Sequence, residues 1–331
     1  MLNGLNGETE VEAVLGRYPG LAARRATPQG GGFSGARVFR VAGLPGDFAL
    51  RFWPVERTAA EVAHIHRLMA EARRRLSFVP ALLPCDTGQT FLEWRGGLVE
   101  VTTWMPGTAD GAAPPAPQRV TAACRALARL HGVWEGGYGR AVCPGVRRRL
   151  EALETWRRVG SVVGVTPRSK QAALLAEASR LIERWFTAAA GALERWTREM
   201  VDVQPCLCDI WRAHVLFTED AVTGLIDFGS VKEDGVAGDL ARLLGSLAEE
   251  DEALWRVGLD AYGRERPLAP KEWEMARALD RTGVVVALTH WLRWLGLGER
   301  RFADEAAAFR RLESLVARVG KWTLFGPLEV E

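Results

Sequence analysis

CLCDIWRAHVLFTEDAVTGLIDFGS, residues 206–230, contains two aspartates, Asp209 and Asp227, on either side of two short apolar runs. The runs at 215–217 and 223–226 predict two strands, because the acidic pair between them is typical of a turn. Both carboxylates are therefore expected near one mouth of a β-hairpin. In that position one carboxylate can take the proton of an attacking hydroxyl while the other holds Mg²⁺ against nucleotide phosphates.

The motifs around these aspartates resemble the catalytic and metal-binding loops of the aminoglycoside phosphotransferase and choline kinase-like family, small-molecule relatives of protein kinases. The family pattern is H-G-D-x-x-x-x-N in the first loop and I-D-x-G or I-D-F-G in the second, and IDFG occurs here at 226–229. The resemblance implies that Asp209 is the catalytic base and that Asp227 binds the metal ion. It extends over roughly residues 25–300.

Two positions of the first loop depart from the family pattern. Leu207 stands where the family has histidine, and His214 stands where it has the asparagine that binds a metal ion. Neutral imidazole can bind a divalent ion, but Mg²⁺ prefers oxygen, so His214 is expected to tilt the preference toward Mn²⁺. The alternative is a strand-edge histidine that hydrogen-bonds to backbone. Arg212 adds a cation that can face the transferring phosphoryl group.

A glycine-rich segment, QGGGFSG at 29–35, precedes an alternating strand at 37–41. Backbone at Gly31, Gly32 and Ser34 can approach phosphates closely, because glycine has no Cβ to clash. Glycine clusters also form ordinary turns, so the segment gains its meaning as a nucleotide loop from the resemblance.

The strand expected at 48–52 carries Arg51 in the position of the family's lysine. A guanidinium can bridge phosphate oxygens at two points, so this replacement keeps the phosphate contact. The following helix, expected at 58–75, offers Glu61 near its start as the carboxylate that orients Arg51. An exposed strand arginine and an exposed-face glutamate are the alternative interpretations.

Two strands at 90–94 and 98–102 flank a Gly-Gly pair and predict a tight hairpin. In the resembling family the second strand leads to the interlobe hinge, whose backbone groups hold adenine. The resemblance therefore implies that Thr103 and Met105 lie at the nucleotide base.

Beyond the hinge the chain has the pattern of helices, apart from the catalytic hairpin. RALARLH at 125–131 resembles the family's L-A-x-L-H helix, which implies that His131 packs beneath the catalytic loop. Asp239, in the sequence GDLA, is expected to accept hydrogen bonds from that loop and so to hold Asp209 in place. An ordinary helix N-terminal carboxylate is the alternative.

Length and composition favour two lobes or domains without identifying a substrate. The chain has 331 residues, 48% of them hydrophobic, and a net charge of +2 that gives no global attraction to nucleic acid or to a membrane. Five scattered cysteines do not form a disulfide framework or a zinc site. No signal pattern and no membrane-length apolar segment is found, so a cytoplasmic protein is expected.

The sequence thus predicts an α+β, bilobal protein-kinase-like fold. Its N-lobe, residues 1–103, combines an antiparallel sheet with a helix and the glycine-rich nucleotide loop, and its C-lobe, residues 104–331, is mainly helical and bears the catalytic hairpin. The resemblance implies phosphorylation of a small-molecule hydroxyl, in an antibiotic, amino alcohol, sugar or other metabolite. The cofactors implied are ATP or GTP with Mg²⁺ or Mn²⁺.

A nucleotide-binding pseudokinase that acts as scaffold or sensor is the alternative function. The changes at Leu207 and His214 favour it, whereas retention of both aspartates, the glycine loop and a basic strand residue favours the enzyme. The acceptor and the oligomeric state are left open. The acidic run at 249–252 is interpreted either as an attractor for a polycationic antibiotic or as a solvated face.

Overall fold

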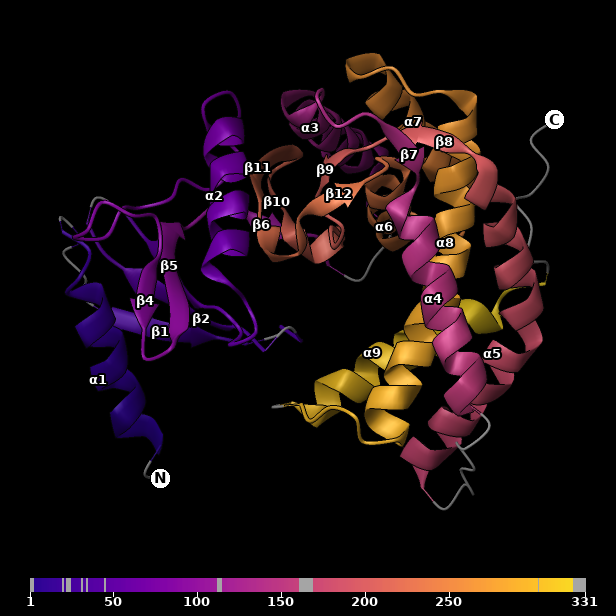
Figure 1. Ribbon diagram of the computed structural model, residues 1–331, viewed down its shortest axis with the longest axis horizontal. Coiled ribbons are helices and arrows are strands. Elements are labelled where there is room, and N and C mark those ends of the chain that lie inside the picture. The colour runs from indigo at the N-terminus through magenta and orange to yellow at the C-terminus, as the bar shows by residue number, and fades with distance from the viewer. Residues whose placement is uncertain are drawn as a thin grey trace. The chain divides into compact units, whose positions relative to one another are not determined.

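The chain forms two compact units in the computed structural model (Figure 1). Unit 1 comprises Met1–Asp110 and Ala213–Gly229, and unit 2 comprises Gly111–Arg212 and Ser230–Glu331. The structure describes residues 3–19, 21, 25–30, 32–33, 35–44, 46–111, 115–160, 169–302 and 304–323, with backbone alone for 3–8.

Unit 1 is built on a five-stranded antiparallel sheet with the strand order β1-β2-β3-β5-β4. The strands are β1 (Arg25–Gln29), β2 (Arg37–Ala42), β3 (Phe48–Phe52), β4 (Leu92–Trp94) and β5 (Gly97–Thr103). The predicted strands at 37–41 and 48–52 and the predicted hairpin are confirmed. Strand β1 was not expected, because RATPQ is mostly exposed and contains a proline, which is tolerated only at a sheet edge.

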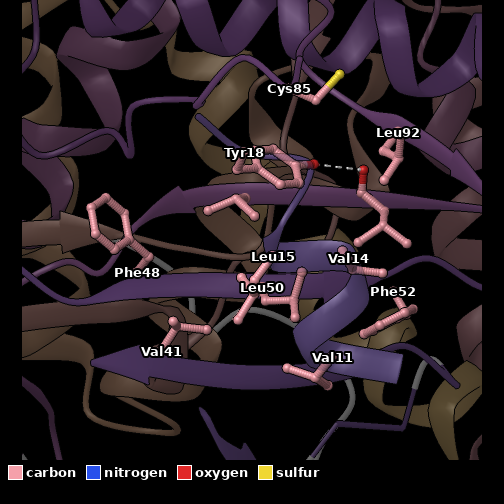
Figure 2. Close-up of a cluster of buried hydrophobic side chains, with 12 residues drawn as sticks. Val11, Val14, Leu15, Tyr18, Val41, Phe48, Leu50, Phe52, Cys85 and Leu92 are labelled. Carbon is pink, nitrogen blue, oxygen red and sulfur yellow. Dashed lines mark hydrogen bonds between the residues drawn. The ribbon is translucent and has the colours of Figure 1, made fainter. Parts of the chain in front are cut away.

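Helix α1 (Asn3–Leu15) packs its apolar side chains against one face of this sheet. Figure 2 shows Val11, Val14 and Leu15 beside Leu50 and Phe52 of β3, all of them buried. The hydroxyl of Tyr18, just after the helix, donates a hydrogen bond to the β5 backbone. This cluster forms the hydrophobic core between α1 and the sheet.

Helix α2 (Ala59–Arg73) covers the opposite face of the sheet. Nε2 of its buried His66 lies 2.5 Å from Oε2 of Glu100 in β5. Along β5, Glu100 alternates with residues that face α1, so its side chain lies on the other face of the sheet. Thr58 caps the helix, and its side chain and that of Glu61 form a capping box. The helix predicted at 58–75 is confirmed.

A second, three-stranded sheet holds the predicted hairpin. β10 (Val215–Thr218) pairs with β11 (Ala221–Leu225) and with β6 (Thr108–Ala109), all antiparallel. Because of these pairings, residues 104–110 and 213–229 belong to unit 1. The division expected from the sequence ended the N-lobe at residue 103 and so placed both segments in the C-lobe. Pairing between segments so distant in sequence leaves no local signal.

Unit 2 is mainly helical, with α8 contacting four other helices, α4, α5, α6 and α9, and α3 packing on α7. Two short antiparallel pairs join β7 to β8 and β9 to β12. No helix in the described ranges is long and apolar enough to cross a bilayer. The helices and strands are α3 (Pro117–Trp134), β7 (Arg140–Val142), α4 (Pro144–Val159), α5 (Lys170–Glu194), β8 (Met200–Asp202), β9 (Gln204–Cys206), β12 (Lys232–Asp234), α6 (Ala237–Leu247), α7 (Glu252–Glu265), α8 (Pro270–Trp291) and α9 (Glu305–Gly320), with short 3₁₀ or π turns at Arg195–Arg198, Arg212–His214, Phe228–Ser230 and Leu292–Gly296.

Gly107 joins β5 to the three-stranded sheet at a point where no side chain fits. Its φ is +95°, and a Cβ at this position would lie 2.6 Å from the carbonyl oxygen of Phe217. Thr223 closes the same junction, since its hydroxyl donates to the Pro106 carbonyl at 2.8 Å. The junction therefore requires glycine both for its backbone angle and for its close packing.

Gly107→Ala is expected to destabilise unit 1 by about 2–4 kcal/mol, because it adds a clash with backbone to the cost of a left-handed alanine. Urea unfolding followed by fluorescence measures the loss. Gly96→Ala is the matched control, since Gly96 also has a positive φ but nothing within 4 Å of its Cβ position. Equal losses in the two variants would show that packing at Gly107 contributes nothing.

Candidate active site

Arg51 and Asp227 form the centre of a charged cluster in unit 1. A guanidinium nitrogen of Arg51, Nη2, lies 3.0 Å from Oδ1 of Asp227, and the two side chains are 13% and 35% exposed. Arg51 alternates along β3 with the buried Leu50 and Phe52, so its side chain leaves the sheet on the face opposite α1. The Gly229 amide also donates to Asp227, at 3.4 Å.

Two further basic side chains, those of His214 and Arg57, lie near the same carboxylate. Nε2 of His214 lies 3.8 Å from Oδ2 of Asp227. Arg57 donates to the Gly229 carbonyl at 2.7 Å, and the guanidinium groups of Arg57 and Arg51 lie 5.9 and 4.4 Å from the ring centre of Trp53. The aromatic face favours both cations near this point. Three basic groups around one carboxylate suit a ligand that combines phosphates with a metal ion.

The Asp227 carboxyl is held ionised. Burial raises its pKa, but the charges of Arg51 and His214 and the hydrogen bonds from Arg51 and the Gly229 amide outweigh burial, so the pKa lies below its ordinary value. The backbone of Asp227 is left-handed, with a φ of +61°, which costs a non-glycine residue about 1–2 kcal/mol. Such strain is retained where surrounding contacts fix the conformation, as is common at functional sites.

Asp227 and His214 lie near enough to contribute to one divalent-ion site. Neighbouring ligand atoms of an octahedral ion are about 3 Å apart when each lies about 2.1 Å from the ion. Nε2 of His214 and Oδ2 of Asp227 are 3.8 Å apart, so a small side-chain shift brings them to that separation. The predicted metal ligands are therefore brought together.

Glu61 is engaged elsewhere than predicted. The expected Arg51–Glu61 pair is not formed, because the carboxylate that Arg51 contacts is that of Asp227. Glu61 instead accepts hydrogen bonds from the amide and the hydroxyl of Thr58, each at 2.9 Å, and lies 3.7 Å from Arg57. The spacing from Thr58 to Glu61 is that of a capping box, a local signal that predicts this contact from the sequence.

The segment predicted to hold adenine lies at the end of β5. The Thr103 amide donates to the Ala81 carbonyl, and the Ala81 amide donates to the Thr103 hydroxyl, both at 2.9 Å. Met105 is buried. The polar groups of Thr103 are thus used within unit 1, and the adenine contact stays a prediction.

The glycine-rich loop is described only in part. Gly31 and Ser34, two of its three predicted phosphate contacts, lie outside the described residues. Gly32 is exposed, and Gly30 and Gly35 have open space where a side chain would begin. Its role in phosphate binding therefore stays a prediction.

In unit 2, a buried carboxylate fixes the loop that follows β9. Asp239, at the start of α6, accepts hydrogen bonds from the amides of Leu207 and Cys208, both at 2.7 Å. Its Oδ2 also lies 3.1 Å from Nε2 of His131, whose other ring nitrogen lies 2.8 Å from the Tyr262 hydroxyl. The predicted roles of Asp239 and His131 beneath the catalytic loop are confirmed.

Asp209, two residues after Leu207, forms an ion pair with Arg242 of α6. Both side chains are half-exposed, so the carboxylate stays accessible. The Leu207 side chain, where the family has histidine, is buried. Arg242 was not predicted, although it stands three residues after Asp239, a spacing that places both on one side of the helix.

Arg212 of the same loop is anchored through its backbone, because its amide donates to the Ser246 hydroxyl at 2.8 Å. Its side chain contributes to a cavity in unit 2. The prediction that it faces the phosphoryl group is neither supported nor opposed by these contacts.

His131, Cys206 and Asp239 bring possible metal-ligating atoms within 4.8 Å of one another. Burial raises the pKa of the Cys206 thiol well above its ordinary range, so the sulfur stays protonated. The oxygens of Asp239 already serve two amides and His131. This cluster is therefore a structural hydrogen-bond network.

Comparison with known proteins assigns the same fold. A family model described as "Phosphotransferase enzyme family" matches residues 25–279. A homoserine kinase of Cupriavidus necator is 26% identical over 256 residues, which cover 74% of this chain and 68% of that relative. The family resemblance inferred from the sequence is confirmed.

Two solved structures share the α+β kinase-like fold. Spectinomycin phosphotransferase in complex with ADP and spectinomycin has a TM-score of 0.68 at 11% identity, over 95% of this chain and 97% of that one. Amicoumacin kinase in complex with AMP-PNP and Ca²⁺ has a TM-score of 0.64 at 14% identity, over 99% of this chain and 98% of that one. The predicted fold class is confirmed.

Arg51→Met is expected to raise the pKa of the Asp227 carboxyl, because it removes the main charge that offsets burial. In the parent protein the folded-state pKa lies below the unfolded value of about 3.9, so the stability that ionised Asp227 contributes is present above that value and is lost as the pH falls through the folded-state pKa. The stability difference between parent and Arg51→Met should therefore shrink below a pH of about 4.

Urea unfolding over a pH series measures this difference. In an Asp227→Asn background, the effect of Arg51→Met should lose its pH dependence over the acid range. The same pH dependence in both backgrounds would show that another group is responsible.

Proposed function

The chain belongs to the phosphotransferase enzyme family, which makes it a small-molecule kinase, and we propose that it transfers the terminal phosphoryl group of ATP or GTP to a small-molecule hydroxyl. The observation that carries this proposal is the cluster of Arg51, Arg57 and His214 around the ionised carboxylate of Asp227. Such a cluster provides two phosphate-binding cations, Arg51 and Arg57, beside a carboxylate and an imidazole that can bind a metal ion, which phosphoryl transfer requires.

In this proposal the residues of unit 1 hold the nucleotide. Arg51 and Arg57 bind phosphate oxygens, and Asp227 and His214 bind Mg²⁺ or Mn²⁺. The bound ion neutralises negative charge on the phosphates during transfer. The glycine-rich loop covers the phosphates, and backbone at Thr103 to Met105 contacts the purine.

Asp209 acts on the acceptor as general base. The acceptor oxygen forms a bond to the terminal phosphorus, the bond from that phosphorus to the leaving diphosphate breaks, and the hydroxyl proton passes to a carboxylate oxygen of Asp209. The ion pair with Arg242 orients the carboxylate for this step. Arg212 faces the transferring group.

The acidic run at 249–252 is partly engaged in ion pairs within unit 2. Glu250 pairs with Arg281 at 2.6 Å and with Arg318 at 3.0 Å, and Glu252 pairs with Arg277. The remaining aspartate caps α7. Arginines thus pair with two of the four carboxylates of the run, which weakens its attraction for a polycationic antibiotic.

Asp209→Asn and Asp227→Ala separate chemistry from binding. Asp209→Asn should keep Mg²⁺–ATP affinity and lose about 10²–10⁴-fold in kcat, because only the proton acceptor is removed. Asp227→Ala should lose Mg²⁺-dependent nucleotide binding itself. Calorimetric titration with Mg²⁺–ATP and a screen for acceptor-dependent ADP formation measure the two effects, with Asp220→Asn in the exposed hairpin turn as control.

Normal turnover in Asp209→Asn would reject its role as base, and unchanged nucleotide binding in Asp227→Ala would reject the metal assignment. A parent protein that binds nucleotide and turns over no acceptor in the screen would favour the scaffold or sensor alternative.

His214→Asn should shift the metal preference toward Mg²⁺. Imidazole nitrogen is accepted more readily by Mn²⁺ than by Mg²⁺, and the substitution replaces it with an amide oxygen. The ratio of Mn²⁺- to Mg²⁺-supported turnover measures the shift, with His64→Asn on α2 as control. An unchanged ratio would make His214 structural, and the second metal ligand would have to be another residue.

A further inference from the structure

Unit 2 contains a cavity of about 260 Å³ beside the loop that carries Asp209. Helices α6, α8 and α9 form most of its wall, with the end of that loop and part of α4. Five arginines and two carboxylates line it: Arg149, Arg212, Arg242, Arg311, Arg318, Glu249 and Asp280. The lining is therefore strongly cationic.

The carboxylate deepest in this wall is already neutralised. Asp280 is almost fully buried and accepts hydrogen bonds from Arg318 at 2.5 and 3.1 Å. Arg318 also pairs with Glu250. Asp280 and Glu250 are thus paired with Arg318, so they do not neutralise the other arginines of the cavity.

Arg149 forms no ion pair with any described carboxylate. Its Nη1 donates to the Gly145 carbonyl at 3.0 Å, but its Nε is buried without a hydrogen-bond partner. The guanidinium lies against Gly283 of α8, where a Cβ would be 3.5 Å from Nε and Nη2. Burial lowers the pKa of Arg149, although an arginine stays charged at physiological pH.

Arg311 of α9 likewise has no carboxylate partner among the described residues. Its guanidinium lies 5.0 Å from the ring centre of Trp211. Burial lowers its pKa, the charge of Arg242 lowers it further, and the charge of the Asp209 carboxylate partly offsets both. Two partly buried cations that form no ion pair of their own within the described chain are unfavourable in the free protein, and a bound anion would reduce that cost.

We propose that this cavity binds a carboxylate or phosphate group of the acceptor through Arg149 and Arg311, so that the acceptor is a small anionic alcohol. That the bound anion belongs to the acceptor rests on the proposed function. Arg242 lines the cavity and also pairs with Asp209, so an anion held here places the rest of the molecule toward the base. The volume lies below the roughly 300–1,000 Å³ usual for drug-sized ligands, which favours a small metabolite over a large antibiotic.

The first experiment compares acceptors of different charge with the full-length protein. The carboxylate series consists of an anionic, a neutral and a cationic alcohol of matched length: 4-hydroxybutyrate, 4-hydroxybutanamide and 4-aminobutanol. The phosphate series compares glycerol 3-phosphate with glycerol. Acceptor-dependent ADP formation should be highest in an anionic set, and the two anionic arms distinguish carboxylate from phosphate. A neutral or cationic acceptor with the highest kcat/KM would overturn the proposal.

The second experiment uses Arg149→Gln and Arg311→Gln, with Arg310→Gln as the matched control on the exposed side of α9. Loss of a charge-assisted contact should raise KM for the anionic acceptor about tenfold or more, with a much smaller change in kcat. Arg311→Lys keeps the charge and should recover part of the loss. Equal KM values for Arg311→Gln and Arg310→Gln would overturn the assignment.

A binding measurement separates this inference from the proposed function. Inorganic phosphate and glycolate should raise the unfolding temperature of the parent and of Arg310→Gln, and less so that of Arg311→Gln. Without ligand, Arg311→Gln should unfold at or above the parent temperature, because it removes a partly buried charge that forms no ion pair with a described carboxylate. Anion stabilisation without ATP turnover would count against the kinase assignment alone, whereas stabilisation equal in Arg311→Gln and the parent would overturn the anion site alone.

Discussion

The carboxylate of Asp239 is the contact on which the loop that carries Asp209 depends. It is fully buried, and it joins the start of α6 to two backbone amides of the loop and to His131 of α3. A buried carboxylate is tolerated only when its oxygens are satisfied, so these three segments must meet in one arrangement. The positions of Asp209 and Arg242, which follow Leu207 and Asp239 by a few residues, are consequences of that arrangement.

The sequence predicts the roles of His131 and Asp239 because each residue lies in a short motif, RALARLH or GDLA, that resembles a motif of the family. The strand pattern of β10 and β11, the IDFG turn and the GDLA helix start all lie within one short stretch or in regular helical spacing. The fold class and the paired roles of Asp239 and His131 follow from them. Helix capping also has a local sequence signal. The position of Glu61 suits both a capping box with Thr58 and a pair with Arg51, and the structure forms the capping box.

Other parts of the site arise from contacts between segments far apart in the chain. Arg57 reaches the Gly229 carbonyl across 172 positions, and β6 pairs with β10 across more than 100 positions. The arginines of the unit 2 cavity come from four separate segments. No period or spacing in the sequence brings such residues together, because their proximity is set by tertiary packing within each unit rather than by local propensity.

The ion pair between Arg51 and Asp227 makes each group the counter-ion of the other when no ligand is bound. An anion that binds Arg51 alone leaves Asp227 uncompensated beside negative phosphates, and a cation that binds Asp227 alone leaves Arg51 facing another positive charge. A ligand and a metal ion that arrive together leave neither charge exposed. Each should therefore strengthen the binding of the other by the same factor, as thermodynamic linkage requires.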